Sequence, residues 1–493
     1  MLHTNVGLAN GAIGAINAAH DNVPVIMMSG RTPTTEKDHF GSRTVPIGWG
    51  QEMRDQTALV REASKWDYEL RVADQIIDLL DRASAIANST PKGPVYLSLP
   101  REVLCEKISA SLLEQPPSMS PASTIAMSED IDQLADWIAE AEHPVIFSQR
   151  GSGTAEGFVA LTSLVDQWAI PVNSYWAQAA AIPTDHPMFI GFEPSPWVEE
   201  ADLIILVDAL APWMPNVHKP SPKTKIVSIG PSPLFARTPV RNFHSHLSLA
   251  GETTSIVKQL SHRLTTKSTQ RNSRVQQRWK DVSTRSEATR KSMEDMALKA
   301  KGQTMTKAWV AKCLSDAVAQ IEKTGRKTAV TSELGCPLAF MKVTHHNGYR
   351  QEPHSGGLGY SLPAAMGIQL AEPETLVFAT MGDGSYIFAN PTACHQVCEA
   401  LQLPVVTCVL NNEEWGAVRQ SVTGLYPDGY AAKANEMPLT ALRPTPAFTK
   451  TAEASRAYAE RVEGGEELPG AIARAIKVAT EERRQVLLDI KIS

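Results

Sequence analysis

The sequence predicts an α/β protein built from three doubly wound parallel sheets. Short runs rich in β-branched residues open after Pro or Gly, and longer Ala-rich stretches of helical character separate them along the whole chain. This alternation is typical of parallel strands joined by helical crossovers. A length of 493 residues exceeds one core of ordinary size and predicts several domains.

Eight short apolar runs bounded by turn residues are the clearest strand candidates. They are residues 24–28, 94–99, 144–148, 201–208, 225–229, 376–381, 405–410 and 486–490. Two polar stretches without periodicity, at about 114–128 and 265–278, predict linkers, and the mixed charges of residues 279–301 predict a solvated connecting helix. The predicted domains are therefore residues 1–113, 128–262 and 304–493.

Composition and charge narrow the class of protein. Hydrophobic residues make up 43% of the chain and charged residues 20%, as in folded globular proteins. The net charge of −6 offers no positive field for nucleic acid, so no nucleic-acid partner is expected. No apolar run is long enough to cross a bilayer, and the first residues match neither a secretory signal nor a transit peptide, so a cytoplasmic location is expected.

The strongest functional signal is Gly382-Asp383-Gly384-Ser385, which follows a predicted buried strand. The next predicted strand leads directly to Asn411-Asn412. Asp383 and Asn412 should therefore lie beyond the carboxyl ends of two strands joined by one crossover, where open parallel sheets bind ligands. A carboxylate oxygen, an amide oxygen and a carbonyl from the following turn would form a hard oxygen site suited to Mg²⁺. A turn at Gly384 and Ser385 would offer donors to phosphate oxygens.

These motifs resemble the cofactor motif of thiamine-diphosphate enzymes, within the acetolactate synthase and benzoylformate decarboxylase group. Residues 354–367 and 411–418 of the third block fit this group, as do residues 65–68 and 91–100 of the first block. The middle block resembles this group only in the alternation of its predicted strands and helices. The resemblance implies that the first domain binds the pyrimidine ring and the third domain binds the diphosphate and Mg²⁺.

The resemblance also assigns roles to single residues. Asp383, the Asn412 side chain and the Glu414 carbonyl would bind Mg²⁺. The residues implied in cofactor binding are Asn10, Gly356, Leu358, Gly382, Gly384, Ser385 and Asn412, so Asn412 has both roles. Among these, the Gly356 carbonyl would accept a hydrogen bond from the 4′-amino group, and Leu358 would be the apolar wedge that forces the cofactor to bend.

Residues that would contact substrate follow from the same resemblance. Leu2-His3-Thr4 is similar to the segment that supplies an active-site His in benzoylformate decarboxylase, so His3 is the candidate acid or base. Acetolactate synthases have no His there, and this detail favours a decarboxylase or lyase. Gln51, Ala417 and Val418 are the candidates for the substrate pocket.

One departure from the family pattern concerns the Glu that hydrogen-bonds the pyrimidine ring. In the family this Glu lies on an element before the segment matched by residues 2–14, and no residue of this sequence can be assigned to the role. The sequence is therefore expected to be a fragment that lacks the start of the first domain. A degenerate subunit without the activating Glu is the alternative.

The resulting hypothesis is a thiamine-diphosphate- and Mg²⁺-dependent decarboxylase or carboligase that acts on a 2-oxo acid or an acyloin C–C bond. The alternatives are an acetolactate synthase that condenses two 2-oxo acids, and a non-catalytic subunit that binds cofactor. The resemblance implies a homodimer or homotetramer. FAD binding stays open but is not favoured, because the segment at 229–233 lacks the acidic residues usual for it.

Overall fold

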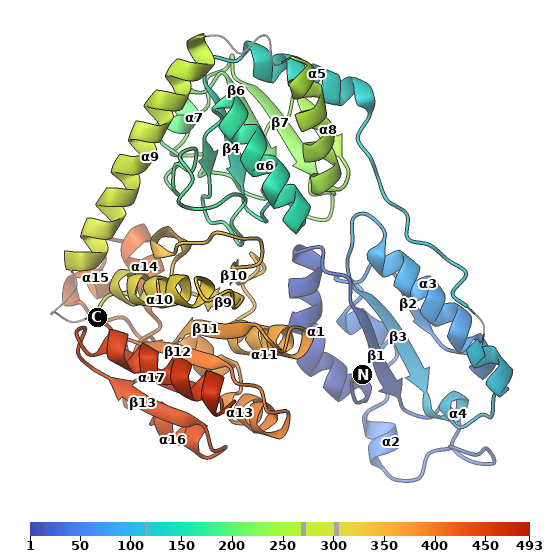
Figure 1. The fold of residues 1–493 in the computed structure, drawn as a ribbon. Helices are drawn as coiled ribbons and strands as arrows, with labels where there is room; N and C mark the ends of the chain where they lie inside the picture. The colour runs from blue at the N-terminus through green and yellow to red at the C-terminus, as the bar shows by residue number, and fades with distance from the viewer. Residues whose placement is uncertain (115, 268–272, 300–304) are drawn as a thin grey trace. The chain divides into compact units, whose positions relative to one another are not determined.

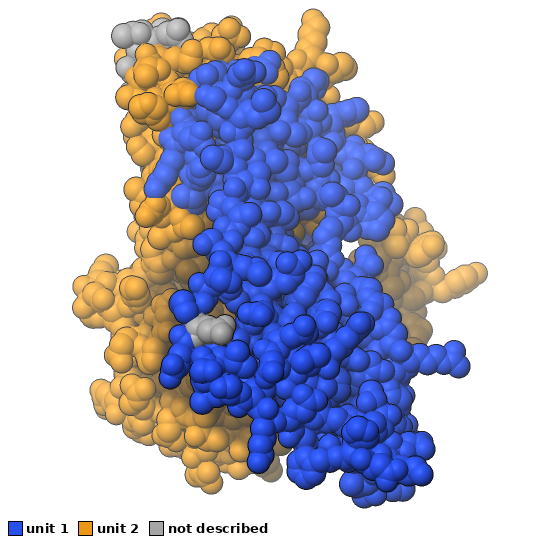
Figure 2. Space-filling view, turned by 90° about the vertical axis from the view of Figure 1, so that its right-hand side faces the viewer, with its two compact units in different colours: residues 1–134, 227–260, 353–357 blue, residues 135–226, 261–352, 358–493 orange. Residues whose placement is uncertain are grey.

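The structure is a computed structural model that describes residues 1–114, 116–267, 273–299 and 305–493. Its strands form three parallel sheets, which confirms the predicted α/β class (Figure 1). The chain divides into two compact units (Figure 2). Unit 1 comprises residues 1–134, 227–260 and 353–357, and unit 2 comprises residues 135–226, 261–352 and 358–493. The boundaries of three separate domains remain a prediction.

The first sheet has three strands in the order β1-β3-β2. They are β1 (Ile26–Arg31), β2 (Asp67–Glu69) and β3 (Val95–Pro100). Helix α1 (Thr4–His20) shares an apolar cluster with Tyr96, whereas α3 (Ile76–Asn88) shares another with Val95 and Leu97. Since neighbouring residues of a strand point to opposite faces, the two helices cover opposite faces of this sheet. Short helices α2 (Ile47–Gly50) and α4 (Arg101–Leu104) complete this part.

The middle sheet has the order β5-β4-β6-β7-β8. Its strands are β4 (Pro144–Ser148), β5 (Val172–Asn173), β6 (Leu203–Val207), β7 (Lys225–Gly230) and β8 (Leu247–Ala250). The helices of this stretch are α5 (Ser128–Glu140), α6 (Ala155–Trp168), α7 (Trp197–Glu200) and α8 (Thr253–Thr266). All five residues of β4 and of β6 are buried, as expected for central parallel strands.

Helix α9 (Ser273–Lys299) contains the predicted connecting helix and is exposed along most of its length, while Val275, Arg278, Val282, Ser286 and Ala297 are buried. Arg278 on this helix is only 8% exposed. Its guanidinium donates four hydrogen bonds of 2.7–3.0 Å to the carbonyls of Ala141, Glu142, Trp168 and Ala169. These carbonyls lie at the carboxyl ends of α5 and α6, where the last carbonyls of a helix lack partners within it. Burial lowers the pKa of Arg278 to about 10, which leaves the side chain charged at neutral pH.

The predicted linker at 265–278 is wrong where the structure describes it, because α8 extends to Thr266 and α9 begins at Ser273. The polar sequence misled the prediction, since it reflects the exposed faces of two helices. Residues 268–272 and 300–304, including the end of the predicted connector, lie outside the described residues.

The third sheet has six strands in the order β10-β9-β11-β12-β14-β13. They are β9 (Thr328–Glu333), β10 (Tyr349–Gln351), β11 (Leu376–Gly382), β12 (Val406–Asn411), β13 (Tyr458–Val462) and β14 (Val486–Lys491). In the described part of the chain, no helix is both long and apolar enough to span a membrane.

Helices cover both faces of the third sheet, as the prediction of a doubly wound sheet requires (Figure 1). On one face, α10 (Lys307–Glu322) and α17 (Leu468–Glu481) share an apolar cluster with Phe378 and Cys408. On the other face, the cluster includes Val377 and Val409 and residues of four helices. These are α11 (Ser361–Ala371), α12 (Asp383–Phe388), α13 (Pro391–Ala400) and α16 (Phe448–Glu453). Because the central strands are buried on both faces, the residues at their carboxyl ends are held in fixed positions.

Candidate active site

The Gly382–Ser385 motif joins β11 directly to α12, so the predicted turn is instead the first turn of a helix. Gly382 is the N-cap residue with extended backbone (φ −71°, ψ 162°), and Asp383 is the first helical residue. Gly382 pairs with Leu410 of the neighbouring strand β12. The two strands therefore end side by side, and Asp383 and Asn412 both follow carboxyl ends as predicted.

Three oxygen-bearing groups meet at this point. The end of the Asn412 amide lies 2.8 Å from the Glu414 carbonyl oxygen and 3.2 Å from Asp383 Oδ1. With its nitrogen turned to this side, the amide would donate to both oxygens. With its oxygen turned there, three acceptors face one another, which is favourable only around a cation. The donor set of carboxylate, amide and carbonyl oxygens fits Mg²⁺.

The Asp383 carboxylate also favours a bound cation, because one of its oxygens has no hydrogen-bond partner among the described residues. It is only 2% exposed, and its Oδ2 has no hydrogen-bond partner among the described residues. Burial raises the pKa of Asp383, while the backbone N–H of Gly384, at 2.9 Å from Oδ1, opposes this shift. A buried polar group without a partner costs about 1–3 kcal/mol, and a bound cation would offset that cost.

The neighbouring polar groups are already engaged, which explains why the Glu414 carbonyl is the candidate ligand. The Glu414 carboxylate accepts from Arg419 Nη1 at 3.0 Å and from Thr440 Oγ1 at 2.9 Å. The Asn411 amide donates to Asp489 Oδ1 at 3.0 Å. Within the described ranges, no three His, Cys, Asp or Glu side chains form a metal cluster. A metal at this site would thus depend on amide and carbonyl oxygens.

Gly384 is required by close packing against Trp415. A Cβ at position 384 would lie 2.2 Å from Cζ3 of the Trp415 ring, whereas a Cβ at Gly382 would have no described atom within 4 Å. We expect Gly384→Ala to lower the free energy of unfolding by about 1–3 kcal/mol through overpacking, and Gly382→Ala to lower it by less than about 1 kcal/mol. Thermal unfolding of the two variants measures the difference. Equal unfolding temperatures would show that the ring moves aside freely.

The backbone on either side of Leu358, the predicted wedge residue, is closely packed, whereas the Leu358 side chain is exposed. Leu358 is 37% exposed, so it is not an ordinary core residue. Gly356 and Gly359 on either side have positive φ angles of 66° and 83°. Within unit 1, Ser355 Oγ donates to Asn17 Oδ1 on α1 at 2.6 Å. A Cβ at Gly357 would lie 2.5 Å from Ile13 of the same helix, so this approach requires glycine.

In unit 1, the structure places Gln51 in contact with Thr4, the residue that follows His3. His3 is an exposed residue at the N-cap of α1, and no described group forms a capping bond with its side chain. Thr4 is buried and has a φ of 43°, an unfavourable conformation for a β-branched residue. Its hydroxyl donates to Gln51 Oε1 at 3.3 Å. The hydrogen bond between Thr4 and Gln51 holds the start of α1, next to His3, despite the unfavourable backbone conformation of Thr4.

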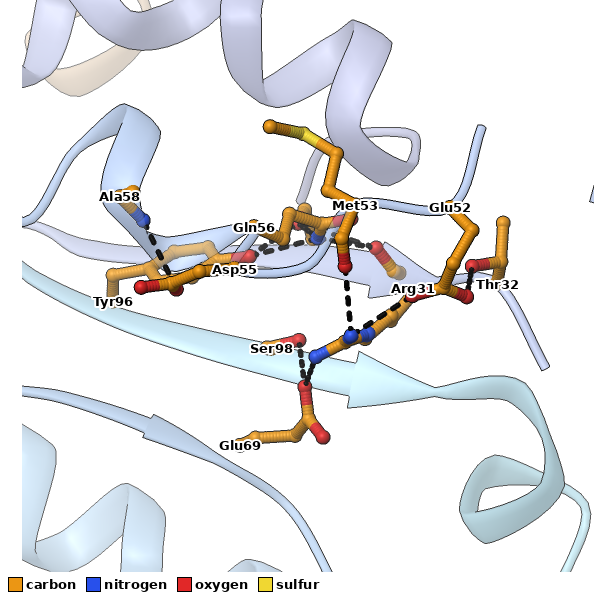
Figure 3. A network of polar contacts seen from close by, with 12 residues as sticks. Arg31, Thr32, Glu52, Met53, Asp55, Gln56, Ala58, Glu69, Tyr96 and Ser98 are labelled. Carbon is orange, nitrogen blue, oxygen red and sulfur yellow. Dashed lines mark hydrogen bonds and ion pairs between the residues drawn. The ribbon is translucent and has the colours of Figure 1, made fainter. Parts of the chain in front are cut away.

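The residue after Gln51 belongs to a charged network (Figure 3). The Arg31 guanidinium lies between the carboxylates of Glu52 and Glu69, and its Nη2 is 2.9 Å from Glu52 Oε1. Thr32 and Arg43 also donate to Glu52. Burial by itself would raise the pKa of Glu52, but these donors outweigh burial and lower it. Glu52 is therefore a structural anchor of the segment that contains Gln51.

The remaining predicted residues are exposed. Ala417 and Val418 lie in the first turn of α14 (Gly416–Leu425), directly after the Asn412 and Glu414 segment. Asn10 is exposed on α1, and its amide donates to the Val6 carbonyl of the same helix at 2.9 Å. His3, Asn10, Gln51 and Gly356 thus belong to unit 1, and the other predicted site residues belong to unit 2.

Three ionisable residues, one buried and two half-buried, were missed by the sequence analysis. Glu333 ends β9 and is fully buried. Lys307, the first residue of α10, donates from Nζ to the Leu334 carbonyl at 2.5 Å, and burial lowers its pKa. Burial raises the pKa of Glu352 to about 7, and its Oε2 has no partner within the described ranges. In the sequence, Glu333 could have been noticed as an acidic residue directly before Leu334-Gly335. It was missed because the strand that it ends, β9, is polar and was not predicted.

Comparisons with known proteins agree with this fold. The model of the thiamine pyrophosphate enzyme central domain matches residues 131–260. The model of the thiamine pyrophosphate enzyme C-terminal TPP binding domain matches residues 333–490, which include Asp383, Asn412 and Glu414. Together the two models cover more than half of the chain. The chain belongs to the thiamine pyrophosphate enzymes, and its C-terminal domain is one that binds this cofactor.

Individual relatives differ in their named activities. The chain is 24% identical to a probable acetolactate synthase large subunit of Methanocaldococcus jannaschii, over 99% of this chain and 80% of the relative. It is also 24% identical to a probable 2-ketoarginine decarboxylase of Pseudomonas aeruginosa, over 86% of this chain and 72% of the relative. A solved structure of a thiamine diphosphate-dependent 4-hydroxybenzoylformate decarboxylase from Rhodococcus jostii superimposes with a TM-score of 0.76. That match has 21% identity and covers 100% of this chain and 86% of the other, so it shows the shared fold.

Proposed function

We propose that this protein is a thiamine-diphosphate- and Mg²⁺-dependent enzyme that decarboxylates a 2-oxo acid or forms or cleaves an acyloin C–C bond. The observation that carries the proposal is the buried Asp383 carboxylate, whose Oδ2 lacks a partner in the described chain, beside the Asn412 amide and the Glu414 carbonyl. A carboxylate, an amide and a carbonyl are suited to a hard cation that also binds phosphate oxygens.

Different residues of the chain are proposed to bind the metal and the different parts of the cofactor. Asp383, Asn412 and Glu414 would hold Mg²⁺, and Gly384 and Ser385 would face the diphosphate. The exposed Leu358 side chain would support the bent cofactor. The Gly356 carbonyl would accept a hydrogen bond from its amino group. When bound, thiamine diphosphate supplies an electron sink that stabilises the carbanion formed as the C–C bond breaks.

Proton transfer at the substrate is the proposed role of His3. Its side chain is exposed, and Thr4 and Gln51 fix the backbone beside it. An imidazole can serve as a general acid or base, which suits steps in which the reacting carbon gains or loses a proton. Gln51, Ala417 and Val418 are the proposed contacts with substrate.

We expect His3→Ala to lower kcat for CO₂ release from a 2-oxo acid by about 10²–10⁴-fold, because a positioned acid or base contributes a factor of this size. The affinity for thiamine diphosphate should stay unchanged, since His3 is not assigned to cofactor binding. His39→Ala is the matched control, because His39 is an exposed histidine of the same unit. Wild-type turnover in the His3 variant would remove His3 from the mechanism.

Reaction products distinguish the alternatives. Among the relatives, one is named a 2-ketoarginine decarboxylase and others are named acetolactate synthases. A decarboxylase releases an aldehyde with CO₂, whereas an acetolactate synthase yields a 2-hydroxy-2-methyl-3-oxo acid from two 2-oxo acids. His3 favours the decarboxylase. If the pure protein binds cofactor but turns over no 2-oxo acid, the non-catalytic subunit replaces both proposals.

We also propose that the protein is a homodimer or homotetramer, which sedimentation of the pure protein tests directly. A visible absorption spectrum of the same sample tests the expectation that it holds no FAD.

A further inference from the structure

The buried carboxylate of Glu333 lies at the start of α11 and accepts hydrogen bonds from backbone N–H groups there. Glu333 is fully buried and accepts three backbone hydrogen bonds. Gly359 N–H donates to Oε1 at 2.7 Å, and Tyr360 N–H and Ser361 N–H donate to Oε2 at 2.6 and 2.9 Å. The first N–H groups of a helix have no partner within it, and negative charge is favourable there. Glu333 therefore satisfies the donors that immediately follow Leu358.

Glu333 also lies beside the strand that leads into the segment assigned to the diphosphate, because it pairs in register with Met381 of β11. Burial raises the pKa of Glu333, whereas the N–H groups of Ser361 and Gly359 and the side chain of Ser385 oppose this shift. Ser385 lies in the first turn of α12, two residues after Asp383. One buried residue thus connects Leu358–Tyr360, which we call the wedge loop, to Met381 near the end of β11, two residues before Asp383.

Backbone packing supports the link between the wedge loop and α12. Gly359 has a φ of 83°, and a Cβ there would lie 2.9 Å from the carbonyl carbon and oxygen of Phe388, the last residue of α12. The wedge loop therefore lies directly on α12 where its backbone is fixed. The Leu358 side chain, by contrast, is 37% exposed. Its position depends on the fixed backbone that follows it, because few neighbours cover it.

We propose that Glu333 is a positioning residue that holds the wedge loop at a fixed place relative to the diphosphate-binding turn of α12. This inference rests on the proposed function, since it assumes that both segments bind parts of one thiamine diphosphate molecule. Glu333 would preorganise the two segments, so the bent cofactor would bind without first ordering the loop.

The test compares two probes by calorimetry in the presence of Mg²⁺. Thiamine diphosphate needs both segments, whereas inorganic diphosphate needs only the turn of α12 and the metal. In Glu333→Gln the amide nitrogen would face N–H donors. We expect Kd for thiamine diphosphate to rise by about tenfold or more, about 1.4 kcal/mol, relative to Kd for inorganic diphosphate. Glu372→Gln at the exposed C-cap of α11 is the matched control and should leave the ratio unchanged.

A second readout needs no ligand. Hydrogen exchange at the amides of Gly359, Tyr360 and Ser361 should become faster in Glu333→Gln, while exchange within β11 and β12 stays slow. If Glu333→Gln does not fold, Glu333→Asp, which keeps the charge on a shorter side chain, carries the same two measurements and should show a smaller change in the same direction.

The outcomes separate this inference from the proposed function. If the wild-type protein binds no thiamine diphosphate, the proposed function fails, and this inference fails with it. If the wild type binds and the Glu333 variants keep the wild-type ratio of the two Kd values, only the positioning role is overturned. A raised ratio together with faster exchange at the three amides supports it.

Discussion

Asp383→Asn is expected to weaken Mg²⁺-dependent binding of thiamine diphosphate by at least about a hundredfold, since even partners that only orient a metal ligand are worth about 10–100-fold in metal affinity. Asp383 is the only charged group among the three proposed ligands. A neutral amide in its place leaves the cation with three neutral oxygen donors or fewer. Calorimetric titration of the protein with cofactor, with and without Mg²⁺, measures the loss.

Stability gives this variant an independent signature. Because Asp383 is buried and one of its oxygens lacks a partner among the described residues, removing the charge should not destabilise the metal-free protein. We expect its free energy of unfolding to stay within about 1 kcal/mol of wild type or to rise. The increase in unfolding temperature that Mg²⁺ and cofactor give the wild type should disappear.

Asp316→Asn is the matched control, because the Asp316 side chain is 63% exposed on α10 of the same unit. It should keep both the cofactor affinity and the Mg²⁺-dependent stabilisation. Undiminished affinity in Asp383→Asn would remove the metal site from this end of the sheet.

Arg278→Met should lower the free energy of unfolding by about 3–5 kcal/mol, because several buried carbonyls lose their donor and each unsatisfied buried acceptor costs about 1–3 kcal/mol. The substitution leaves four carbonyls at the ends of α5 and α6, three of them buried, without this donor. It also removes one of the contacts that join α9 to these helices, beside those of Arg274 and Trp279. Urea denaturation followed by circular dichroism measures the shift in the unfolding midpoint.

Two further variants separate the hydrogen bonds from the loss of charge. Lys280→Met removes one positive charge from the exposed face of the same helix and should shift stability by no more than about 0.5 kcal/mol. Arg278→Lys keeps the charge, but a single ammonium lacks the planar fork that reaches two helix ends, so an intermediate loss is expected. Equal midpoints for Arg278→Met and wild type would show that the ends of α5 and α6 do not need this donor.

The sequence predicted those parts of the fold that consist of apolar runs. All eight predicted strands overlap observed strands, including β11 and β12, which precede the proposed metal ligands. The strands that were missed are short or polar, such as β5 with two residues and β9 with the sequence Thr-Ala-Val-Thr-Ser-Glu. Strand β9 is fully buried because the sheet encloses it, and this is a property of tertiary packing that local composition does not express.

The candidate site was predictable where one short motif contains the chemistry, as in Gly382–Ser385 and Asn411–Asn412. The structure adds which atoms are available there. It shows Asn411 bonded to Asp489 and the Glu414 carboxylate bonded to Arg419, and these facts depend on partners distant in sequence. Glu333 was missed for the same reason, because its partners are backbone N–H groups of a loop 26 to 28 residues away.

Helix α14, which contains two of the proposed substrate contacts, would give the protein room to change its substrate over evolutionary time. None of its ten residues, all of them described, is buried, although it follows directly from the proposed metal-binding segment. Side chains such as Ala417 and Val418 can therefore be exchanged with little penalty to folding, whereas the six residues of β12 just before them are all buried and constrained. Selection for a new substrate can act on this helix while the cofactor chemistry is retained. In a library randomised at positions 417 and 418, we expect most variants to fold and the differences to appear in substrate preference.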